Sequence, residues 1–298
     1  MNFLMNKLTI AAPAKLNLHL EVLNKRKNGF HDLKSVFLAV NFGDTLHFEP
    51  LDGEKTAEIA VKGLNLDIPP EKNIIFRALC LFRKKTSFAN GLKITVEKRI
   101  PSGGGLGGGS SDAAAALLAL NEMADYPLSR AALLDTAEAL GSDVPFFIYR
   151  TAAALVTGRG DIIEPFKAPR LFFVLVNPGF PSDTAAAFRL LDEYRVKFKT
   201  PHKEARRREI EGEVFSDLAR WSFWNDFLAV FGERERSVYD EIIGGLRELG
   251  AGFAGLSGTG STCFGVFTES ESAQRAAEAL RGKWNFVEYC GTWSEGAN

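Results

Sequence analysis

Hydrophobic and polar residues alternate along much of the first hundred residues. The clearest case is residues 15–23, KLNLHLEVL, in which every second side chain is apolar. A period of two predicts a half-buried β-strand with one apolar face and one polar face. The polar face carries Lys15, Asn17, His19 and Glu21, and the pattern taken alone favours exposure of that face to solvent. Further extended segments are expected at residues 30–40, 45–49, 56–61 and 92–97.

Helical spacing replaces this alternation in several later segments. Over residues 71–85 the apolar side chains recur on one side of a helix. A second amphipathic helix is expected at residues 129–140, with Ser129 as its cap and Gly141 as its stop. Further helices are expected at residues 185–191, 215–231, 238–249 and 273–280, and further strands at 152–157, 171–176, 263–267 and 284–289.

The order of these elements indicates the fold class. Strands and helices follow one another irregularly, which predicts an α+β fold with two packed lobes. At 298 residues the chain is long enough for two lobes with a sizeable core. Residues 165–169 begin and end with proline and form the expected boundary. The N-terminal lobe would then be residues 1–167, and the C-terminal lobe residues 168–298.

A glycine-rich segment joins a predicted strand to a predicted helix. Six of the seven residues 103–109 are glycine, and an alanine- and leucine-rich helix is expected over residues 113–120. Ser110, Ser111 or Asp112 is expected to cap that helix. Backbone amides that open into a helix N-terminus form a site for phosphate. A flexible linker is also rich in glycine, but a linker would join domains rather than a strand and a helix.

The spacing of glycine, lysine and serine distinguishes the known classes of phosphate-binding loop. A P-loop needs lysine directly after its last glycine, whereas serine follows Gly109 here. A G-x-G-x-x-G match lies within residues 103–108, but no acidic residue ends a second strand about 20 residues later, which argues against a Rossmann oxidoreductase. Residues 101–111, PSGGGLGGGSS, instead resemble the phosphate loop of the GHMP superfamily of small-molecule kinases.

Composition and net charge limit the remaining classes of function. The net charge of −1 gives no general attraction to nucleic acid or to acidic membranes, so an anion site must be local. Cys80, Cys263 and Cys290 stand among apolar neighbours and are expected to be buried free thiols in a reducing compartment. No signal peptide and no apolar run of membrane-spanning length are found, so we expect a cytoplasmic protein. The sequence holds no zinc-ligand spacing and no protein-kinase H-R-D or D-F-G motif.

Two charged residues fit phosphoryl transfer to a hydroxyl group. Such catalysis depends on positioning and on neutralising the transferred group. Lys15 is a candidate cation and Asp143 a candidate base. Asp143 precedes an apolar stretch that contains proline, where an unpartnered carboxylate would be costly, although a helix cap or turn is the alternative. Mg²⁺ is expected as a cofactor, bound chiefly through the phosphates of ATP.

Five motifs in one order make the resemblance more specific. They are APAKLNL at 12–18, NGFHDL at 28–33, PSGGGLGGGSSDAA at 101–114, GSDVPF at 141–146 and LSGTGS at 256–261. Together they resemble the 4-diphosphocytidyl-2-C-methyl-D-erythritol kinase family of the non-mevalonate isoprenoid pathway. The glycine loop alone marks only the superfamily, whereas the combination covers the chain from about residue 11 to residue 267.

The resemblance implies a two-lobed fold with the site in the cleft between the lobes. It also implies that ATP phosphorylates the 2-hydroxyl of the substrate, with Asp143 as the base and Lys15 assisting. Asn73 and Lys98 would contact the nucleoside of ATP, although Asn73 also suits a helix cap. The loop residues that would hold the ATP phosphates are Pro101, Gly103, Gly104, Gly105, Leu106, Gly107, Gly108, Gly109, Ser110 and Ser111.

The same resemblance implies a site for a substrate with a cytidine diphosphate group. His31 would read the cytosine edge, and Phe30 and Phe188 would stack on the base. The remaining substrate-binding residues implied are Asn17, Thr184, Gly258 and Thr259. The implied partner is therefore a small molecule rather than a nucleic acid or a membrane, for a monomer or a homodimer.

One departure from the family affects this site. The family usually has Asp-Gly-Tyr-His where this chain has NGFH at residues 28–31. Phe30 keeps a ring for stacking but loses the hydroxyl and any hydrogen bond that it makes. Asp112 and the charged segment 203–213 match nothing in the family and are assigned no role. A solvated helix or mobile loop is expected for that segment.

Two other functions stay open. Another kinase of the superfamily, acting on mevalonate or homoserine, would have the same phosphate loop. Its substrate has no nucleobase, so Phe30 and His31 favour the cytidine substrate. A non-catalytic nucleotide-binding protein could also keep the fold, but the presence of both Lys15 and Asp143 argues against it.

Overall fold

Two long strands, β1 (Leu8–Lys25) and β2 (His31–Glu54), begin the fold and run through both of its units. The computed structural model describes residues 6–54, 56–63, 72–198 and 210–294. Contacts divide the chain into unit 1, comprising Met1–Ala14, Gly43–Ile100 and Gly107–Arg150, and unit 2, comprising Lys15–Phe42, Pro101–Leu106 and Thr151–Asn298. The units interleave along the sequence and so group the residues differently from the single boundary expected at residues 165–169.

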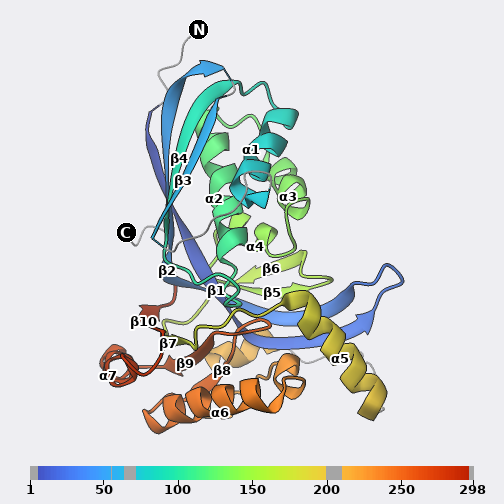
Figure 1. Cartoon of the computed structure of the whole chain (residues 1–298), viewed down its shortest axis with the longest axis vertical. Coiled ribbons are helices and arrows are strands. Elements are labelled where there is room, and N and C mark those ends of the chain that lie inside the picture. Colours follow the sequence, from blue (N-terminus) through green and yellow to red (C-terminus); the bar gives the residue numbers. More distant parts are fainter. Residues whose placement is uncertain (1–5, 55, 64–71, 199–209, 295–298) are drawn as a thin grey trace. The chain divides into compact units, whose positions relative to one another are not determined.

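Unit 1 combines strands and helices around an apolar core. β4 (Asn90–Lys98) pairs antiparallel with the second half of β2 and parallel with β3 (Ala57–Gly63). Figure 1 shows the helices of this unit beside one face of these strands. Phe48, Phe82 and Leu117 are fully buried in it, as alternating and helical apolar spacing predicts. The helices are α1 (Ile74–Lys85), α2 (Gly108–Met123), α3 (Arg130–Glu138) and α4 (Val144–Ile148).

Unit 2 contains a second, antiparallel sheet. Its strand order is β10-β7-β9-β8, and α6 packs on β8 and β9 while α7 packs on β7 and β10 (Figure 1). The first half of β2 pairs with β5, which pairs with β6. The bounds are β5 (Ala153–Thr157), β6 (Ile162–Phe166), β7 (Phe172–Asn177), α5 (Thr184–Phe198), α6 (Glu233–Glu248), β8 (Phe253–Leu256), β9 (Cys263–Phe267), α7 (Ser270–Leu280) and β10 (Phe286–Gly291).

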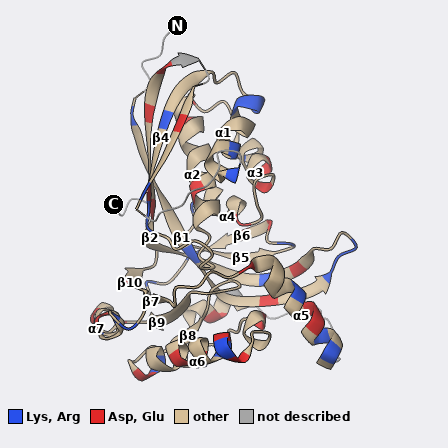
Figure 2. Ribbon diagram, in the orientation of Figure 1, with Lys and Arg blue, Asp and Glu red and all other residues tan. Residues whose placement is uncertain are grey.

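Charged side chains are distributed without a dominant sign. On α5 and α6 of unit 2, basic and acidic residues are interspersed (Figure 2). This mixture agrees with the net charge of −1. The charged segment 203–213 lies outside the described residues up to position 209. No helix in the described part of the chain is both long enough and apolar enough to cross a membrane.

The helix predicted over residues 215–231 is wrong. The structure has three short 3-10 segments there: η2 (Ile210–Phe215), η3 (Leu218–Arg220) and η4 (Asp226–Ala229). Asp217 and Asn225 each accept a hydrogen bond from a backbone N–H two residues later. Such bonds give the backbone an alternative to the helix, and they outweigh the apolar spacing of this stretch.

The prediction for the cysteines is correct at two positions and wrong at one. Cys263 and Cys290 are buried in β9 and β10, and burial raises the pKa of each thiol. Cys80 is free but exposed, because it lies on the outer side of α1 whereas Leu79 and Phe82 face the core. All three are free cysteines.

Candidate active site

The second half of the glycine loop forms the start of α2 in unit 1. Gly107 has φ 70°, a left-handed conformation open to glycine, and the helix begins at Gly108 with no side-chain cap. The prediction that Ser110, Ser111 or Asp112 caps the helix is therefore wrong, because the glycines start it earlier. The first-turn amides have no helical acceptor and face outward along the helix dipole, which suits a phosphate.

The first half of the glycine loop packs against the second glycine-rich segment in unit 2. The Ser257 hydroxyl donates to the Gly105 carbonyl at 2.9 Å, and the Thr262 N–H donates to the Gly104 carbonyl at 3.2 Å. A Cβ added at Gly105 would lie 2.1 Å from the Ser257 carbonyl oxygen. Glycine is therefore required there, because the two loops are in direct backbone contact.

The polar face of β1 is buried rather than solvated, so that prediction is wrong. Lys15 is 4% exposed, Asn17 3%, His19 0% and Glu21 2%. The Lys15 Nζ donates to Asn17 Oδ1 at 2.5 Å and lies 4.7 Å from the centre of the Phe37 ring. The ammonium group is thus held in a fixed position, as a cation that acts on a substrate needs to be.

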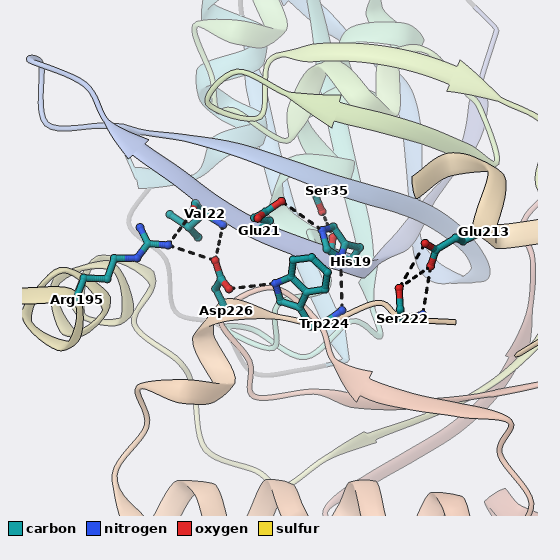
Figure 3. A network of polar contacts seen from close by, with 9 residues as sticks. All are labelled: His19, Glu21, Val22, Ser35, Arg195, Glu213, Ser222, Trp224 and Asp226. Atoms are coloured by element: carbon teal, nitrogen blue, oxygen red, sulfur yellow. Dashed lines mark hydrogen bonds and ion pairs between the residues drawn. The ribbon is translucent and has the colours of Figure 1, made fainter. Parts of the chain in front are cut away.

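A distant segment covers this face (Figure 3). The N–H of Leu20 donates to the carbonyl of Trp224 at 2.8 Å, and the N–H of Val22 donates to Asp226 Oδ2 at 2.9 Å. The Trp224 ring meets the His19 ring edge-on, with centroids 4.2 Å apart. Residues 224–226 therefore act as a short partner to β1 and cover His19 on its polar face.

Asp143 lies at the N-terminal end of α4 in unit 1. It occupies the cap position, with φ −84° and ψ −12°, but its side chain makes no capping hydrogen bond. The alternative of a helix cap or turn is correct for its position, because Asp143 lies in a turn that begins α4, but its carboxylate does not cap the helix. Lys15 belongs to unit 2, so the predicted catalytic pair comes from both units.

The two residues predicted to contact the nucleoside of ATP both lie in unit 1. Asn73 Oδ1 accepts from the Ile75 N–H at 2.9 Å, so Asn73 does cap α1. The Lys98 side chain is 8% exposed, and its Nζ contacts Asp44 and also donates to Asp112 Oδ2 at 2.7 Å. A Cβ added at Gly108 would lie 3.3 Å from the same Nζ and 2.9 Å from Ile100 Cγ2, so a larger residue would be crowded at the start of α2.

Two of the residues predicted to bind cytidine, His31 and Phe188, meet in unit 2. The rings of His31 and Phe188 stack with centroids 5.1 Å apart and 22° between their planes. Phe30 is 52% exposed, with the Arg159 guanidinium 5.7 Å from its ring centre. An exposed aromatic side chain that is next in sequence to a buried, stacked imidazole can contribute to a site for a flat polar ring.

Two more predicted substrate residues lie beside each other in the same unit. The hydroxyl groups of Thr184 and Thr259 are 3.2 Å apart. The carbonyl of Thr259 also accepts from the Ser182 hydroxyl at 2.6 Å, so the start of α5 contacts the second glycine loop. Asn17 reaches this loop from β1, because its N–H donates to Ser257 Oγ at 3.2 Å.

Comparison with known proteins identifies the family. The N-terminal domain of the GHMP kinases matches residues 73–151, and their C-terminal domain matches residues 209–285. A 4-diphosphocytidyl-2-C-methyl-D-erythritol kinase of Thermodesulfovibrio yellowstonii is 35% identical over 281 residues, which is 93% of this chain and 95% of that protein. The chain belongs to this kinase family.

Solved structures agree with the assignment of the kinase. A crystal structure of 4-(cytidine 5'-diphospho)-2C-methyl-D-erythritol kinase has a TM-score of 0.79 at 32% identity and covers 95% of this chain and 98% of its own. A mevalonate kinase of L. major has a TM-score of 0.71 at 18% identity, covers 99% of each chain and shows the fold alone. The predicted α+β GHMP kinase fold and an ATP-dependent phosphotransferase with an alcohol acceptor are therefore confirmed.

Asn225 holds the second glycine loop of the kinase and was not predicted from the sequence. Its Nδ2 donates to the carbonyls of Leu256 at 2.9 Å and Gly258 at 2.7 Å, and its Oδ1 accepts from the Phe227 N–H. The available signal was an Asn-Asp pair within the aromatic stretch FWNDF at 223–227. Buried amides need such partners, so a polar pair at this place indicates a built contact.

The buried Asp112 of the kinase leads to a prediction of how the free energy of unfolding depends on pH. Burial raises the pKa of its carboxyl from 3.8 to about 7, with Lys98 opposing and Asp44 adding to the rise. Between about pH 4 and pH 7 the native state therefore holds a proton that the unfolded state lacks, so stability falls as pH rises through this window. We expect Asp112→Asn to remove that slope and to gain about 1 kcal/mol or more over wild type from pH 4 to pH 7. Urea unfolding at several pH values measures it.

The exposed Asp135 on α3 provides the matched control for this prediction. Asp135→Asn should leave the pH dependence of unfolding unchanged. If the free energy of unfolding depends on pH in the same way in Asp112→Asn and in wild type, Asp112 is ionised in the native state from about pH 4 to pH 7.

Proposed function

We propose that this kinase phosphorylates the 2-hydroxyl of 4-diphosphocytidyl-2-C-methyl-D-erythritol with ATP, in the non-mevalonate isoprenoid pathway. The observation that supports this substrate most directly is the stack of His31 on Phe188, with the exposed Phe30 next to His31 in the chain. A substrate with a cytosine ring needs such a platform and a polar edge, whereas mevalonate and homoserine do not.

Binding of the ATP phosphates and activation of the acceptor hydroxyl are assigned to different groups of this chain. The first-turn amides of α2 receive the ATP phosphates, because that helix starts on glycine without a side-chain cap. Asp143 accepts the proton of the acceptor hydroxyl, and Lys15 stabilises the charge that develops on that oxygen. Lys15 is suited to this because Asn17 and the Phe37 ring fix its ammonium group.

A Mg²⁺ ion fits one buried oxygen of the loop. Ser111 Oγ is buried and, among the described residues, has no hydrogen-bond partner, which leaves a hard oxygen ligand available. The described residues hold no cluster of three His, Cys, Asp or Glu side chains suited to a metal. We therefore propose that Ser111 and the ATP phosphates hold the ion, which when bound neutralises charge on the transferred phosphoryl group.

Phe30 in place of the family tyrosine is compatible with this substrate. Its exposed ring keeps the surface needed to stack on a base. The cation of Arg159 over the ring adds a charged group beside that surface. The three free thiols suit a reducing compartment, and we propose a cytoplasmic location.

The decisive experiment measures ATP consumption with three acceptor conditions. Purified protein is given the cytidine diphosphate methylerythritol substrate, mevalonate or no acceptor. We expect turnover with the first alone. Turnover with mevalonate instead would overturn the cytidine substrate and keep the superfamily, and ATP binding without turnover on either would favour a non-catalytic nucleotide-binding protein.

A further inference from the structure

Helix α5 is fixed against β1 by a buried arginine. The Arg195 side chain is 7% exposed and donates to the carbonyl of Val22 at 2.6 Å and to that of Leu23 at 3.2 Å (Figure 3). It also pairs with Asp226 at 3.3 Å. These bonds satisfy a buried guanidinium from three sides and set the rotation of the helix. Side chains one turn earlier on α5 are therefore presented at a fixed place.

Asp192 lies one turn before Arg195 and contacts the cytidine-site histidine. Its Oδ1 is 2.8 Å from His31 Nε2, and its Oδ2 is 2.5 Å from the Lys25 ammonium. Burial opposes ionisation of Asp192, but its hydrogen bonds with Lys25 and His31 outweigh that effect, so the pKa of this carboxyl lies below its usual value. An ionised carboxylate only accepts hydrogen bonds, so His31 Nε2 carries the proton that it donates.

In the neutral form of His31, the second nitrogen is then an acceptor. In a neutral imidazole with hydrogen on Nε2, Nδ1 keeps a free lone pair. The described residues include no hydrogen-bond partner for Nδ1. The stack on Phe188 and the 4% exposure of the His31 side chain hold the ring plane, so the ring is not free to exchange its two nitrogens.

We propose that Asp192 determines the base specificity of the kinase by fixing His31 as a hydrogen-bond acceptor toward the base. The inference rests on the proposed function and adds the reason for choosing cytosine. Cytosine carries an amino donor at position 4, where uracil carries a carbonyl acceptor. A fixed acceptor therefore bonds the amino group and opposes the carbonyl, as a site with an unmatched buried polar group does.

The first test compares binding of CDP and of UDP by titration calorimetry. Wild type should bind CDP more tightly, and Asp192→Ala should lower the ratio of the two affinities by about tenfold, the loss of one matched hydrogen bond. Asp192→Asn retains an acceptor oxygen and should give an intermediate ratio. Lys25→Met leaves the Asp192 carboxylate and His31 in place. Glu193→Gln changes an exposed neighbour and leaves Lys25, His31 and Asp192 in place. Both variants should therefore keep the wild-type ratio of CDP to UDP affinity.

Kinetics separate this role from a merely structural one. In Asp192→Ala the KM for the cytidine substrate should rise about tenfold, while kcat and the KM for ATP stay unchanged. A fall in kcat together with a higher KM for ATP would indicate general damage to the fold and would overturn the positioning role.

The position of the proton on His31 gives a readout that needs no turnover. Nitrogen-15 NMR distinguishes protonated from unprotonated ring nitrogens, and the spectrum of His31→Gln assigns the signals. Wild type should show hydrogen on Nε2, and Asp192→Ala should lose that preference. Hydrogen on Nδ1 in wild type, or an unchanged CDP to UDP ratio in Asp192→Ala, would overturn the proposal.

The outcomes also separate this inference from the proposed function. Turnover of the cytidine substrate with an unchanged ratio in Asp192→Ala would reject the inference alone. Failure of wild type to phosphorylate that substrate or to bind CDP would reject the proposed function and the base specificity together. The NMR experiment would then report only whether Asp192 fixes the proton on His31.

Discussion

Replacing Asp143 by asparagine is expected to lower kcat by about 10²- to 10⁴-fold, the range for losing a general base. Asparagine has nearly the same shape but accepts no proton. The side chain makes no capping bond to α4, so the substitution removes no helix cap. Steady-state kinetics with the cytidine substrate, together with ATP affinity and a urea unfolding curve, measure the three effects separately.

Asp135→Asn is the matched control, because Asp135 is an exposed aspartate on α3 of the same unit. It should retain wild-type kcat. A loss in Asp143→Asn of tenfold or less would show that the carboxylate orients the hydroxyl without accepting its proton.

Lys15→Met tests whether the two residues act on the same oxygen. Loss of a single charge-stabilising donor is expected to lower kcat by about 10²- to 10³-fold. Residues that act as a unit give non-additive losses, so the double variant with Asp143→Asn should be little slower than the slower single variant. Losses that multiply would show that the residues act independently.

Local sequence patterns predicted the elements whose formation depends on neighbouring residues. Ser129 accepts from the Ala132 N–H and starts α3, and Asn73 starts α1 in the same way. Alternation predicted β4, and the glycine loop was found with its following helix. Caps, glycine conformations and periodicity involve residues a few positions apart, so the sequence carries them directly.

The predictions that were wrong depended on contacts between residues far apart in the sequence. On the polar face of β1, His19 is buried because residues 224–226, which are distant in the sequence, pair with the strand. The same segment was expected to be helical, since nothing in its own pattern shows that it borders a strand. Burial of a polar face depends on what covers it, which alternation alone does not carry.

The candidate site was predicted in a similarly uneven way. Lys15, His31 and Asp143 were found through motifs, because reactive groups recur at fixed spacings. Asn225 and Asp192 were missed, because each acts on a residue brought close only by the fold. Supporting residues of this kind have no spacing of their own relative to the groups they hold.

Two glycines of the same loop should respond differently to replacement by alanine. Gly105→Ala should lower the free energy of unfolding by about 3 kcal/mol or more. Its φ is +74°, and the new Cβ would lie 2.1 Å from the Ser257 carbonyl oxygen and 2.9 Å from that of Gly260, both backbone atoms. Gly109→Ala is different, because Gly109 is inside α2 and the nearest atom to its Cβ is 3.9 Å away on Ile74. Urea unfolding should show it unchanged or more stable by up to about 1 kcal/mol.

The same pair separates folding of the loop from phosphate binding. If the amides of α2 receive the ATP phosphates, the methyl group of Gly109→Ala enters the space that the nucleotide needs, and the KM for ATP should rise although the fold is intact. Gly105→Ala should instead lose stability first, with ATP affinity falling because the second glycine loop is displaced. Wild-type stability in Gly105→Ala would contradict the contact between the two loops. A wild-type KM for ATP in Gly109→Ala would show that the phosphates bind elsewhere than at the first turn of α2.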